Sequence, residues 1–216
     1  MSSTDKHSTD GVPMICISGG DASGKSTQVA ALAAALAADG RSVAEVSIWD
    51  AFTDPHVASK LPFGRREDVF AYLRILGPGA RAHFLFHALH VALDLALEQS
   101  PDIVLLNAHW YKYFATEVAH GGDPEVLRAW TEGFPVPDLT FFLEISPETA
   151  LSRKEQRSDY ESGYGDAVAF VEFQTRSQEV LAGLCTELGW TRLDGTGDPK
   201  KLTARMLAAV RDEVLR

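Results

Sequence analysis

The chain contains few cysteines and no long apolar run. Only two cysteines occur among 216 residues: Cys16 in an apolar stretch and Cys185 in a predicted helix. Neither has a second cysteine or a histidine at metal-ligand spacing, which argues against a disulfide framework or a zinc site and is typical of a reducing compartment. The N-terminal segment MSSTDKHSTDG is polar and lacks the apolar core of a signal peptide. We therefore expect a cytoplasmic protein without a membrane-spanning segment.

Positive charge is also scarce. The 20 Lys and Arg residues are outnumbered by 30 Asp and Glu residues, which leaves a formal net charge of −10. This excess disfavours a nucleic acid or an anionic membrane as the partner. A small anion can still bind, because backbone N–H groups and a few cations can dominate one cleft. The length suits one domain, so we expect a loose tail over residues 1–12 and a single domain over 13–216.

Short apolar runs alternate with longer helical patterns along the chain. This alternation predicts an α/β fold in which a five-stranded parallel sheet is flanked by helices. The expected strands are 14–18, 42–50, 103–107, 139–146 and 190–195. The expected helices are 26–40, 66–76, 80–99, about 111–131, 166–188 and 198–215, and a further helix begins at Pro147 with Ser146 as its N-cap.

Parallel strands end at the same edge of their sheet, and ligands of such sheets bind beside that edge. We therefore expect residues 19–26, 49–52, 107–112 and 146–153 to share one rim. The residues in these four segments are the candidates for any chemistry that the chain performs.

The stretch ISGGDASGKSTQ (17–28) matches the phosphate-binding pattern G-x-x-x-x-G-K-[ST]. It lies between a predicted strand and a predicted helix, so its backbone N–H groups and the helix N-terminus can face phosphate oxygens. Lys25 would reach the β- and γ-phosphates and the Ser26 hydroxyl would hold Mg²⁺, which predicts ATP and Mg²⁺ as cofactors. The alternative is a glycine turn with an incidental lysine. The predicted contacts are Gly19, Gly20, Asp21, Ala22, Ser23, Gly24, Lys25, Ser26 and Thr27.

Five stretches together resemble the thymidylate kinase family of nucleoside monophosphate kinases over nearly the whole chain. They are the phosphate-binding loop, ARAHFLFHALH, PDLTFFLEISPETALSRKEQR, DYESGYGDAVAFVEFQTRSQEVL and WTRLDGTGDPKKL. The resemblance implies the nucleoside monophosphate kinase version of the P-loop NTPase fold, with a LID segment over about 153–166. It also implies phosphoryl transfer from ATP to a nucleotide, dTMP by default, and commonly a homodimer.

The resemblance also implies roles for individual residues. Asp21 would face the acceptor sugar, and Phe86 would stack on the acceptor base. Arg153 and Arg157 would be the LID cations that stabilise charge on the transferred group. Because Ala22 stands where relatives can carry an arginine after the aspartate, these two LID arginines would do that work alone.

The part of the chain expected to hold the acceptor departs from the family pattern. IWDAF stands in place of Arg-Glu-Pro after the second strand, and Asn107-Ala108 stands in place of Asp-Arg after the third. His90 occupies the position of an arginine that reads the base. Two of the missing arginines clamp the acceptor phosphate in the family, and neither histidine nor alanine supplies an always-charged fork. The part of the chain expected to bind ATP thus resembles the family, and the part expected to bind the acceptor differs from it.

Several residues are candidates to replace the missing groups. Asp50 could supply the anion near the nucleophile that Asn107 cannot, although a turn or capping role is an equal alternative. The candidate cations for the acceptor are Arg74, Arg81 and Lys112, each of which could instead be a solvated surface charge. His90 and Asn107 are candidate hydrogen-bond partners of the acceptor. The aromatic residues Trp110, Tyr111 and Tyr113 could either wall the acceptor pocket or pack in the core.

Three hypotheses follow for the function. The first is an ATP-dependent kinase of the thymidylate kinase type that acts on dTMP. The second keeps the kinase chemistry with another small acceptor, such as a modified nucleotide or a nucleoside. The third is a regulatory nucleotide-binding protein that has lost turnover together with the missing aspartate and arginines. In each case the expected partner is a small nucleotide rather than a nucleic acid or a membrane.

Overall fold

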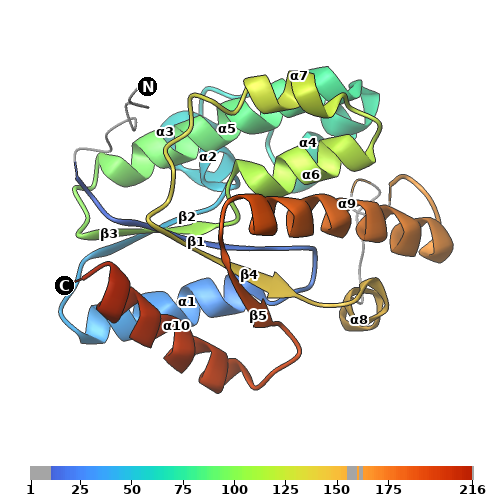
Figure 1. Ribbon diagram of the computed structural model, residues 1–216. Coiled ribbons are helices and arrows are strands. Elements are labelled where there is room, and N and C mark those ends of the chain that lie inside the picture. The colour runs from blue at the N-terminus through green and yellow to red at the C-terminus, as the bar shows by residue number, and fades with distance from the viewer. Residues whose placement is uncertain (1–10, 155–159, 161–162, 216) are drawn as a thin grey trace, which may run out of the picture.

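A computed structural model describes residues 11–154, 160 and 163–215 of the chain. Its five strands form one sheet in the order β2-β3-β1-β4-β5, and every neighbouring pair is parallel. The predicted α/β fold with a five-stranded parallel sheet is therefore confirmed (Figure 1). The strands are β1 (Met14–Gly19), β2 (Val43–Val46), β3 (Ile103–Asn107), β4 (Leu139–Glu144) and β5 (Thr191–Asp194).

Helices cover both faces of this sheet (Figure 1). Helices α1 (Lys25–Ala38) and α10 (Pro199–Glu213) lie on one face. The other face carries α5 (Pro78–Leu97), α6 (Trp110–Ala119) and α9 (Ala167–Glu187), with the short α7 (Pro124–Ala129) beside α6. Helix α8 (Pro147–Arg153) follows β4 at the carboxyl edge of the sheet.

Two hydrophobic cores lie on the two faces of the sheet. Alternate residues of β1 point to opposite sides, so that Met14 and Cys16 join the core under α5, α6 and α9, while Ile15 and Ile17 join the core under α1 and α10. All four side chains are at most 1 % exposed. A strand that is buried on both faces reads as a continuous apolar run, which is why MICIS could be assigned from the sequence.

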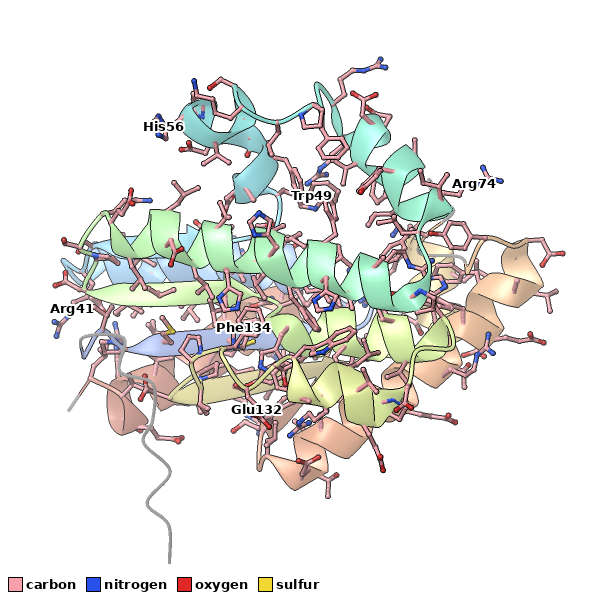
Figure 2. The ribbon with its side chains drawn as sticks, turned by 90° about the horizontal axis from the view of Figure 1, so that it is seen from above. Arg41, Trp49, His56, Arg74, Glu132 and Phe134 are labelled. Atoms are coloured by element: carbon pink, nitrogen blue, oxygen red, sulfur yellow. The ribbon has the colours of Figure 1, made fainter. Side chains whose placement is uncertain are left out.

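The segment between β2 and α5 forms three short helices: α2 (Asp50–Thr53), α3 (Pro55–Ala58) and α4 (Arg66–Ile75). In Figure 2 they lie along the side of α5 opposite to α6 and α7. Aromatic contacts attach them, because Trp49 packs edge-on against Phe70 at 5.3 Å and Phe52 stacks on Phe84 of α5 at 5.6 Å between ring centroids. Helix α4 is thereby held beside the carboxyl ends of the strands.

The predicted second strand is too long. It ends at Val46 rather than at residue 50, because the chain then turns: the Asp50 amide donates to the Ser47 carbonyl at 2.9 Å, and the Asp50 carboxylate accepts from the Ser47 amide at 2.7 Å. Asp50 therefore begins α2 and does not end β2. The alternation of apolar and polar residues in SVAEVSIWD could not reveal this side-chain bond.

The predicted helix over about 111–131 is two helices, α6 and α7, with a break between them. The break lies at Gly121, whose φ is +91°, and at Asp123, whose side chain accepts from the Glu125 and Val126 amides as the N-cap of α7. A β-carbon at Gly122 would lie 2.8 Å from the Glu117 carbonyl oxygen, so only glycine fits this close approach.

Other local predictions are confirmed. The Ser146 hydroxyl accepts from the Thr149 amide at the start of α8, and the Asp198 carboxylate accepts from the Lys200 amide at the start of α10. Of the predicted tail, residues 1–10 lie outside the described residues, as do 155–159 and 161–162 of the predicted LID. Within the described chain, none of the helices combines the length and the apolar character needed to cross a membrane.

Candidate functional site

The loop between β1 and α1 has backbone conformations that favour glycine. Gly19 has φ +150°, and a β-carbon there would lie 2.6 Å from the Leu143 carbonyl oxygen and 2.7 Å from Ser23 Oγ. Gly24, with φ +95°, is the N-cap of α1. Ala22 adopts the left-handed region at φ +57°, which costs a residue with a β-carbon about 1 kcal/mol. The loop is consequently curled into a tight bend directly before the helix.

Lys25 and Ser26 lie in the first turn of α1. The Lys25 side chain is only 8 % exposed, and its Nζ donates to the Gly20 carbonyl at 2.5 Å across the loop. The first N–H groups of a helix have no partners within it and carry partial positive charge. The loop therefore presents an ammonium group and the amides of a helix N-terminus to an anion, which is the set of donors that a polyphosphate requires.

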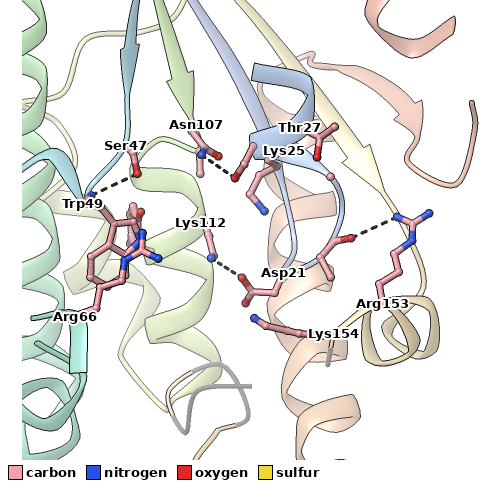
Figure 3. A pocket seen from close by; sticks show the side chains of 15 residues that line it. Asp21, Lys25, Thr27, Ser47, Trp49, Arg66, Asn107, Lys112, Arg153 and Lys154 are labelled. Carbon is pink, nitrogen blue, oxygen red and sulfur yellow. Dashed lines mark hydrogen bonds and ion pairs between the residues drawn. The ribbon is translucent and has the colours of Figure 1, made fainter. Parts of the chain in front are cut away.

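A cavity of about 480 Å³ opens beside this loop (Figure 3). All four segments that were expected to share the rim contribute to its wall. Among the described lining residues, five carry positive charge and one carries negative charge. The cavity is thus cationic in a chain whose net charge is −10, and its size suits a small ligand. The charged lining residues are Asp21, Lys25, Arg66, Lys112, Arg153 and Lys154.

Asp21 is the acidic residue of that wall, and it is buried among cations. Its carboxylate accepts from Lys112 Nζ at 2.6 Å and from Gln174 Nε2 at 3.1 Å. Burial alone would raise the pKa of this carboxyl, but the neighbouring Lys112, Lys25 and Lys154 ammonium groups outweigh burial and hold the pKa well below its ordinary value. Asp21 is therefore a fixed anion that orients Lys112 within the cavity.

Asn107 lies at the carboxyl end of β3, beside the loop. Its Nδ2 donates to Ser26 Oγ at 3.0 Å, so the amide contacts the hydroxyl that is expected to hold Mg²⁺. The next residue, Ala108, has φ +59° and donates its amide to the Ile17 carbonyl at 3.0 Å. Strand β3 therefore ends in a bend that turns α6 and Lys112 toward the cavity.

Arg153 occupies the opposite end of the cavity, at the end of α8. Its Nη1 donates to the carbonyl oxygens of Ala22 and Gly195, at 3.3 and 3.1 Å. Lys154 follows it and also lines the cavity. The second predicted LID arginine, Arg157, lies outside the described residues, so only Arg153 of the pair is placed at the cavity.

Three other candidates, Asp50, Phe86 and His90, do not line this cavity. Asp50 lies at a different hollow, with Glu45 and Asp54 among its neighbours. Phe86 is buried against Phe134, with ring centroids 5.7 Å apart. His90 stacks on the same Phe134 ring at 3.9 Å, and burial lowers the pKa of His90. These rings face the core between α5 and the segment that follows α7, which sequence spacing along α5 could not predict.

The two candidate arginines outside the cavity differ from each other. Arg74 is exposed on α4 and points outward in Figure 2. Arg81 is buried, and its Nε donates to the Glu117 carboxylate at 3.0 and 3.2 Å, while its Nη1 donates to the Leu76 carbonyl at 2.7 Å. The guanidinium of Arg81 is thus committed to an internal ion pair rather than to the cavity.

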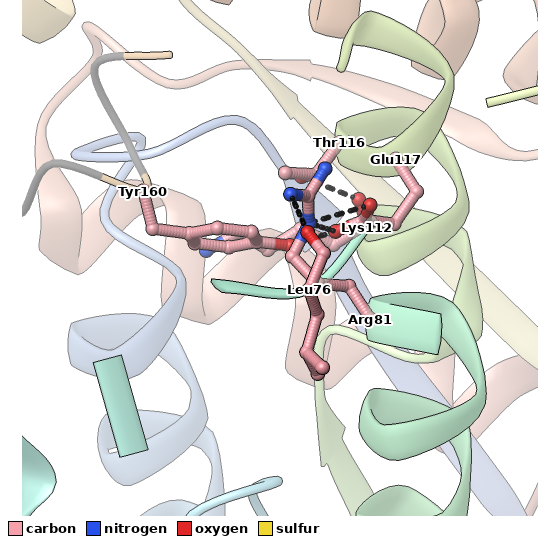
Figure 4. A network of polar contacts seen from close by, with 6 residues as sticks. All are labelled: Leu76, Arg81, Lys112, Thr116, Glu117 and Tyr160. Carbon is pink, nitrogen blue, oxygen red and sulfur yellow. Dashed lines mark hydrogen bonds and ion pairs between the residues drawn. The ribbon is translucent and has the colours of Figure 1, made fainter. Parts of the chain in front are cut away.

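Glu117 completes a buried network with Arg81 and Tyr160 (Figure 4). The Tyr160 hydroxyl donates to the Glu117 carboxylate at 2.9 Å, and the Glu117 side chain is 0 % exposed. Burial raises the pKa of Glu117 to about 7, although the Arg81 ion pair and the Tyr160 hydrogen bond act in the opposite direction. The network joins α5, α6 and the predicted LID segment.

A smaller cavity of about 70 Å³ adjoins the main one and shares Trp49, Lys112 and Tyr113 with it. Its remaining wall is apolar or aromatic. It consists of Ile48, Phe52, Val69, Phe70, Leu73, Leu85 and Tyr160. Tyr113, which the sequence left open between pocket and core, lies at both cavities; Trp110 and Tyr111 are in the core.

Three residues of the main cavity were not singled out from the sequence: Ser47, Trp49 and Arg66. Trp49 lies in a segment that was predicted to share the rim, whereas Arg66 lies in a stretch whose local pattern is interrupted by prolines and glycines. The Arg66 guanidinium carbon lies 4.0 Å from the centre of a Trp49 ring. The available signal was Trp49 itself, near the end of the predicted second strand and at the predicted rim, but its cationic partner Arg66 comes from helix α4.

Comparison with known proteins gives partial matches to thymidylate kinases. No protein-family model matches the chain. A probable thymidylate kinase of Sulfolobus acidocaldarius is 33 % identical over 67 residues, which cover 31 % of this chain and 34 % of that protein. The thymidylate kinase of Akkermansia muciniphila is 42 % identical over 57 residues, or 26 % and 28 % of the two chains.

A longer match exists at lower identity. A probable thymidylate kinase of Pyrobaculum aerophilum is 24 % identical over 201 residues, which span 88 % of this chain and 92 % of that protein. The higher-identity matches therefore cover about a third of their relatives, and the match over nearly full length is weak. The chain is therefore similar to several thymidylate kinases, most strongly over short segments.

Proposed function

We propose that the chain is an ATP-dependent kinase that phosphorylates a nucleoside monophosphate, with dTMP as the first candidate. The observation that carries the proposal is the cationic cavity beside a curled glycine loop, in which Lys25 and the α1 amides lie at one wall. Similarity to thymidylate kinases supports the reaction class and, more weakly, the substrate.

The donor side of the proposed site consists of residues 19–27, with Arg153 beside them. The loop amides and Lys25 would hold the β- and γ-phosphates. Mg²⁺ fits the residues present through Ser26 Oγ and through the oxygens of ATP itself, since Mg²⁺ at phosphate sites keeps few protein ligands. When bound, Mg²⁺ would neutralise charge on the phosphates.

This chain's own residues would then orient and stabilise the transferred group. Lys25, fixed across the loop, meets the terminal phosphates without reorganisation, which is the condition for strong electrostatic stabilisation. Arg153 lies close enough to the loop to add charge when the predicted LID segment 153–166 closes, and we propose Arg157 as its partner. Asp50 has no part in this proposal, because its carboxylate is bonded to the Ser47 amide.

The acceptor side is proposed to be divergent. Asn107 bonds to Ser26, Ala108 forms a bend, and His90 is stacked in the core, so the family's positions for the acceptor arginines carry no cation here. Lys112 and Arg66 supply positive charge from other elements. This replacement favours a second candidate function, which is the same phosphoryl transfer to another small acceptor.

The test is ADP release from Mg-ATP with a panel of nucleoside monophosphates and nucleosides. We expect turnover with at least one monophosphate, and loss of turnover by at least about 100-fold in Lys25→Ala, since the removed interaction strengthens in the transition state. Turnover only with an acceptor other than dTMP would support the second candidate. ATP binding without turnover on any acceptor would overturn both. The proposed single domain over 13–216 and the homodimer are tested separately, by limited proteolysis and light scattering.

A further inference from the structure

Arg66 lines the main cavity and packs against the ring of Trp49. Lys112 is paired with Asp21, and Lys25 and Arg153 bond to backbone carbonyls of the loop and its surroundings. Asp68, two positions after Arg66 on α4, accepts from the Gly64 and Arg65 amides and lies 3.7 Å from the Arg65 guanidinium. Among the described residues, Arg66 therefore lines the cavity wall without an ion pair.

We propose that Arg66, held against Trp49, binds the phosphate of the acceptor, and that the acceptor is therefore a phosphomonoester with an aromatic ring. This inference rests on the proposed kinase function and names the chemistry of its acceptor. It assigns this task to α4, because β3 carries no arginine and Arg81 of α5 is paired with Glu117.

The contact with Trp49 prepares the guanidinium for this task. With its carbon 4.0 Å from the ring centre, the guanidinium lies over the indole face, where cation and ring attract each other. The N–H donors of a guanidinium lie in its plane, so packing against a ring leaves its edge available to an anion. A side chain held in this way loses less conformational entropy on binding than a free lysine or arginine would.

The position of Arg66 separates it from the donor phosphates. In Figure 3, Arg66 and Trp49 lie at one side of the cavity, while Arg153 and Thr27 lie at the other, with Lys112 and Asp21 between them. An anion at Arg66 would thus lie across the cavity from the α1 N-terminus. Two phosphates that approach each other from these sides are the arrangement that transfer between them requires.

The adjoining small cavity explains why the acceptor should carry a ring. Trp49, Lys112 and Tyr113 line both cavities, and the smaller one is otherwise apolar and aromatic. A planar ring buried there would gain contact with Phe70 and Tyr113. A ligand that places its anionic group at Arg66 and its ring in the small cavity would suit the cationic wall of the main cavity and the aromatic wall of the small one.

The test is calorimetric binding of nucleoside monophosphates and of the matching nucleosides to the full chain with Mg²⁺ and a non-hydrolysable ATP analogue. We expect at least one monophosphate to bind at least about tenfold more tightly than its nucleoside. In Arg66→Ala the affinity for this monophosphate should fall by about 10- to 100-fold, as for a lost hydrogen bond to a charged group, while the affinity for the nucleoside is retained. Arg66→Lys should restore part of the lost affinity, because the charge returns without the planar fork.

Arg65 is the matched control on the same helix. It has the same charge, is exposed and lies next to Arg66, but does not line the cavity. Arg65→Ala should therefore leave monophosphate binding unchanged. Where turnover is measurable, Arg66→Ala should raise the KM for the acceptor and leave the KM for ATP unchanged. An unchanged melting temperature of Arg66→Ala would show that the loss is not one of folding.

Three results would overturn the inference: equal binding of monophosphate and nucleoside, wild-type binding by Arg66→Ala, or no binding of any monophosphate. The proposed function fails in a different way, through absence of ADP release while these ligands bind. The two failures are therefore distinguishable in the same set of preparations.

Discussion

Gly19 lies where β1 ends and the phosphate-binding loop begins, and its surroundings exclude a side chain. A β-carbon there would meet the Leu143 carbonyl of the neighbouring strand at 2.6 Å, and a backbone atom cannot move aside cheaply. The glycine of the motif is therefore required by the packing of β1 against β4 as well as by any ligand.

Gly19→Ala should lower the free energy of unfolding by about 1–3 kcal/mol, because it combines a backbone clash with a strained φ. Urea denaturation measures this change. Gly183→Ala is the control, since Gly183 lies within α9 with nothing within 4 Å of its would-be β-carbon. The control should be neutral or stabilising by up to about 1 kcal/mol. Equal effects of the two substitutions would contradict the proposed clash.

At the same scale, contiguous residues could be assigned from the sequence and distant pairs could not. Gly24, Lys25 and Ser26 follow one another, so their joint pattern identifies the loop. The contact of Arg66 with Trp49 and the ion pair of Asp21 with Lys112 join residues that are far apart in the chain. No spacing rule links such residues before the fold brings them together.

At the scale of elements, the buried Arg81–Glu117–Tyr160 network connects α5 and α6 to the segment after α8. Arg81 also bonds to the Leu76 carbonyl at the end of α4, and Tyr160 lines the small aromatic cavity. The network therefore fixes the relative positions of elements that form the cavity wall. Removing one partner of a buried pair is costly because the other charge is left uncompensated.

The wild type should lose stability relative to the Glu117→Gln variant as pH rises from about 4.5 to about 7. The quantity compared is the difference between their free energies of unfolding. The folded state raises the pKa of Glu117 from 4.5 to about 7, so in this window the folded chain holds a proton that the unfolded chain has released. This contribution to stability is complete below pH 4.5 and is lost as pH rises through 7, by on the order of 3 kcal/mol. Urea denaturation at several pH values measures it.

The buried His109 and the partly buried His120 change stability in the same pH range with the opposite sign. Burial lowers the pKa of His109 and of His120 to about 4, so their contribution is lost as pH falls below about 6.5. Because both histidines are present in Glu117→Gln, the difference between the two proteins isolates Glu117. Parallel stability curves for wild type and variant would contradict a raised pKa of Glu117.

At the scale of the whole molecule, a net charge of −10 coexists with a cationic cavity. The cavity is cationic because the carboxyl edge of the sheet gathers lysines and arginines from α1, α4, α6 and α8, while acidic residues lie elsewhere on the surface. The helical dipole of α1 adds to this local charge. The net charge thus disfavours a nucleic acid or an anionic membrane as the partner. The order of strands and helices determines where the cations gather and where a small anion can bind.

A non-hydrolysable Mg-ATP analogue at 100 times its Kd should stabilise the fold by about 2.7 kcal/mol. For a chain of this size that corresponds to a rise in melting temperature of roughly 5–10 °C. Lys25→Ala should abolish the shift, whereas Lys60→Ala, which removes an exposed lysine near α3, should retain it. A wild-type shift in Lys25→Ala would contradict the donor site at the loop.

The sequence by itself determined the layered α/β architecture, the glycine-rich loop before α1 and the capped starts of α8 and α10. These features depend on periodicity and on side chains that bond within a few residues, as Ser146 and Asp198 do. Interactions of this range are encoded locally, so a pattern along the chain is sufficient to find them.

Only the tertiary structure decided the acceptor side. It buried Arg81 against Glu117 and Phe86 against Phe134, and it stacked the half-buried His90 on Phe134, so that none of the three lines the cavity. It placed Trp49 and Arg66 in the cavity wall together with the predicted Lys112. The physical reason is that a side chain's direction depends on how its helix packs against the neighbouring helices. A residue on α5 can face either core or cavity without a change in its local pattern.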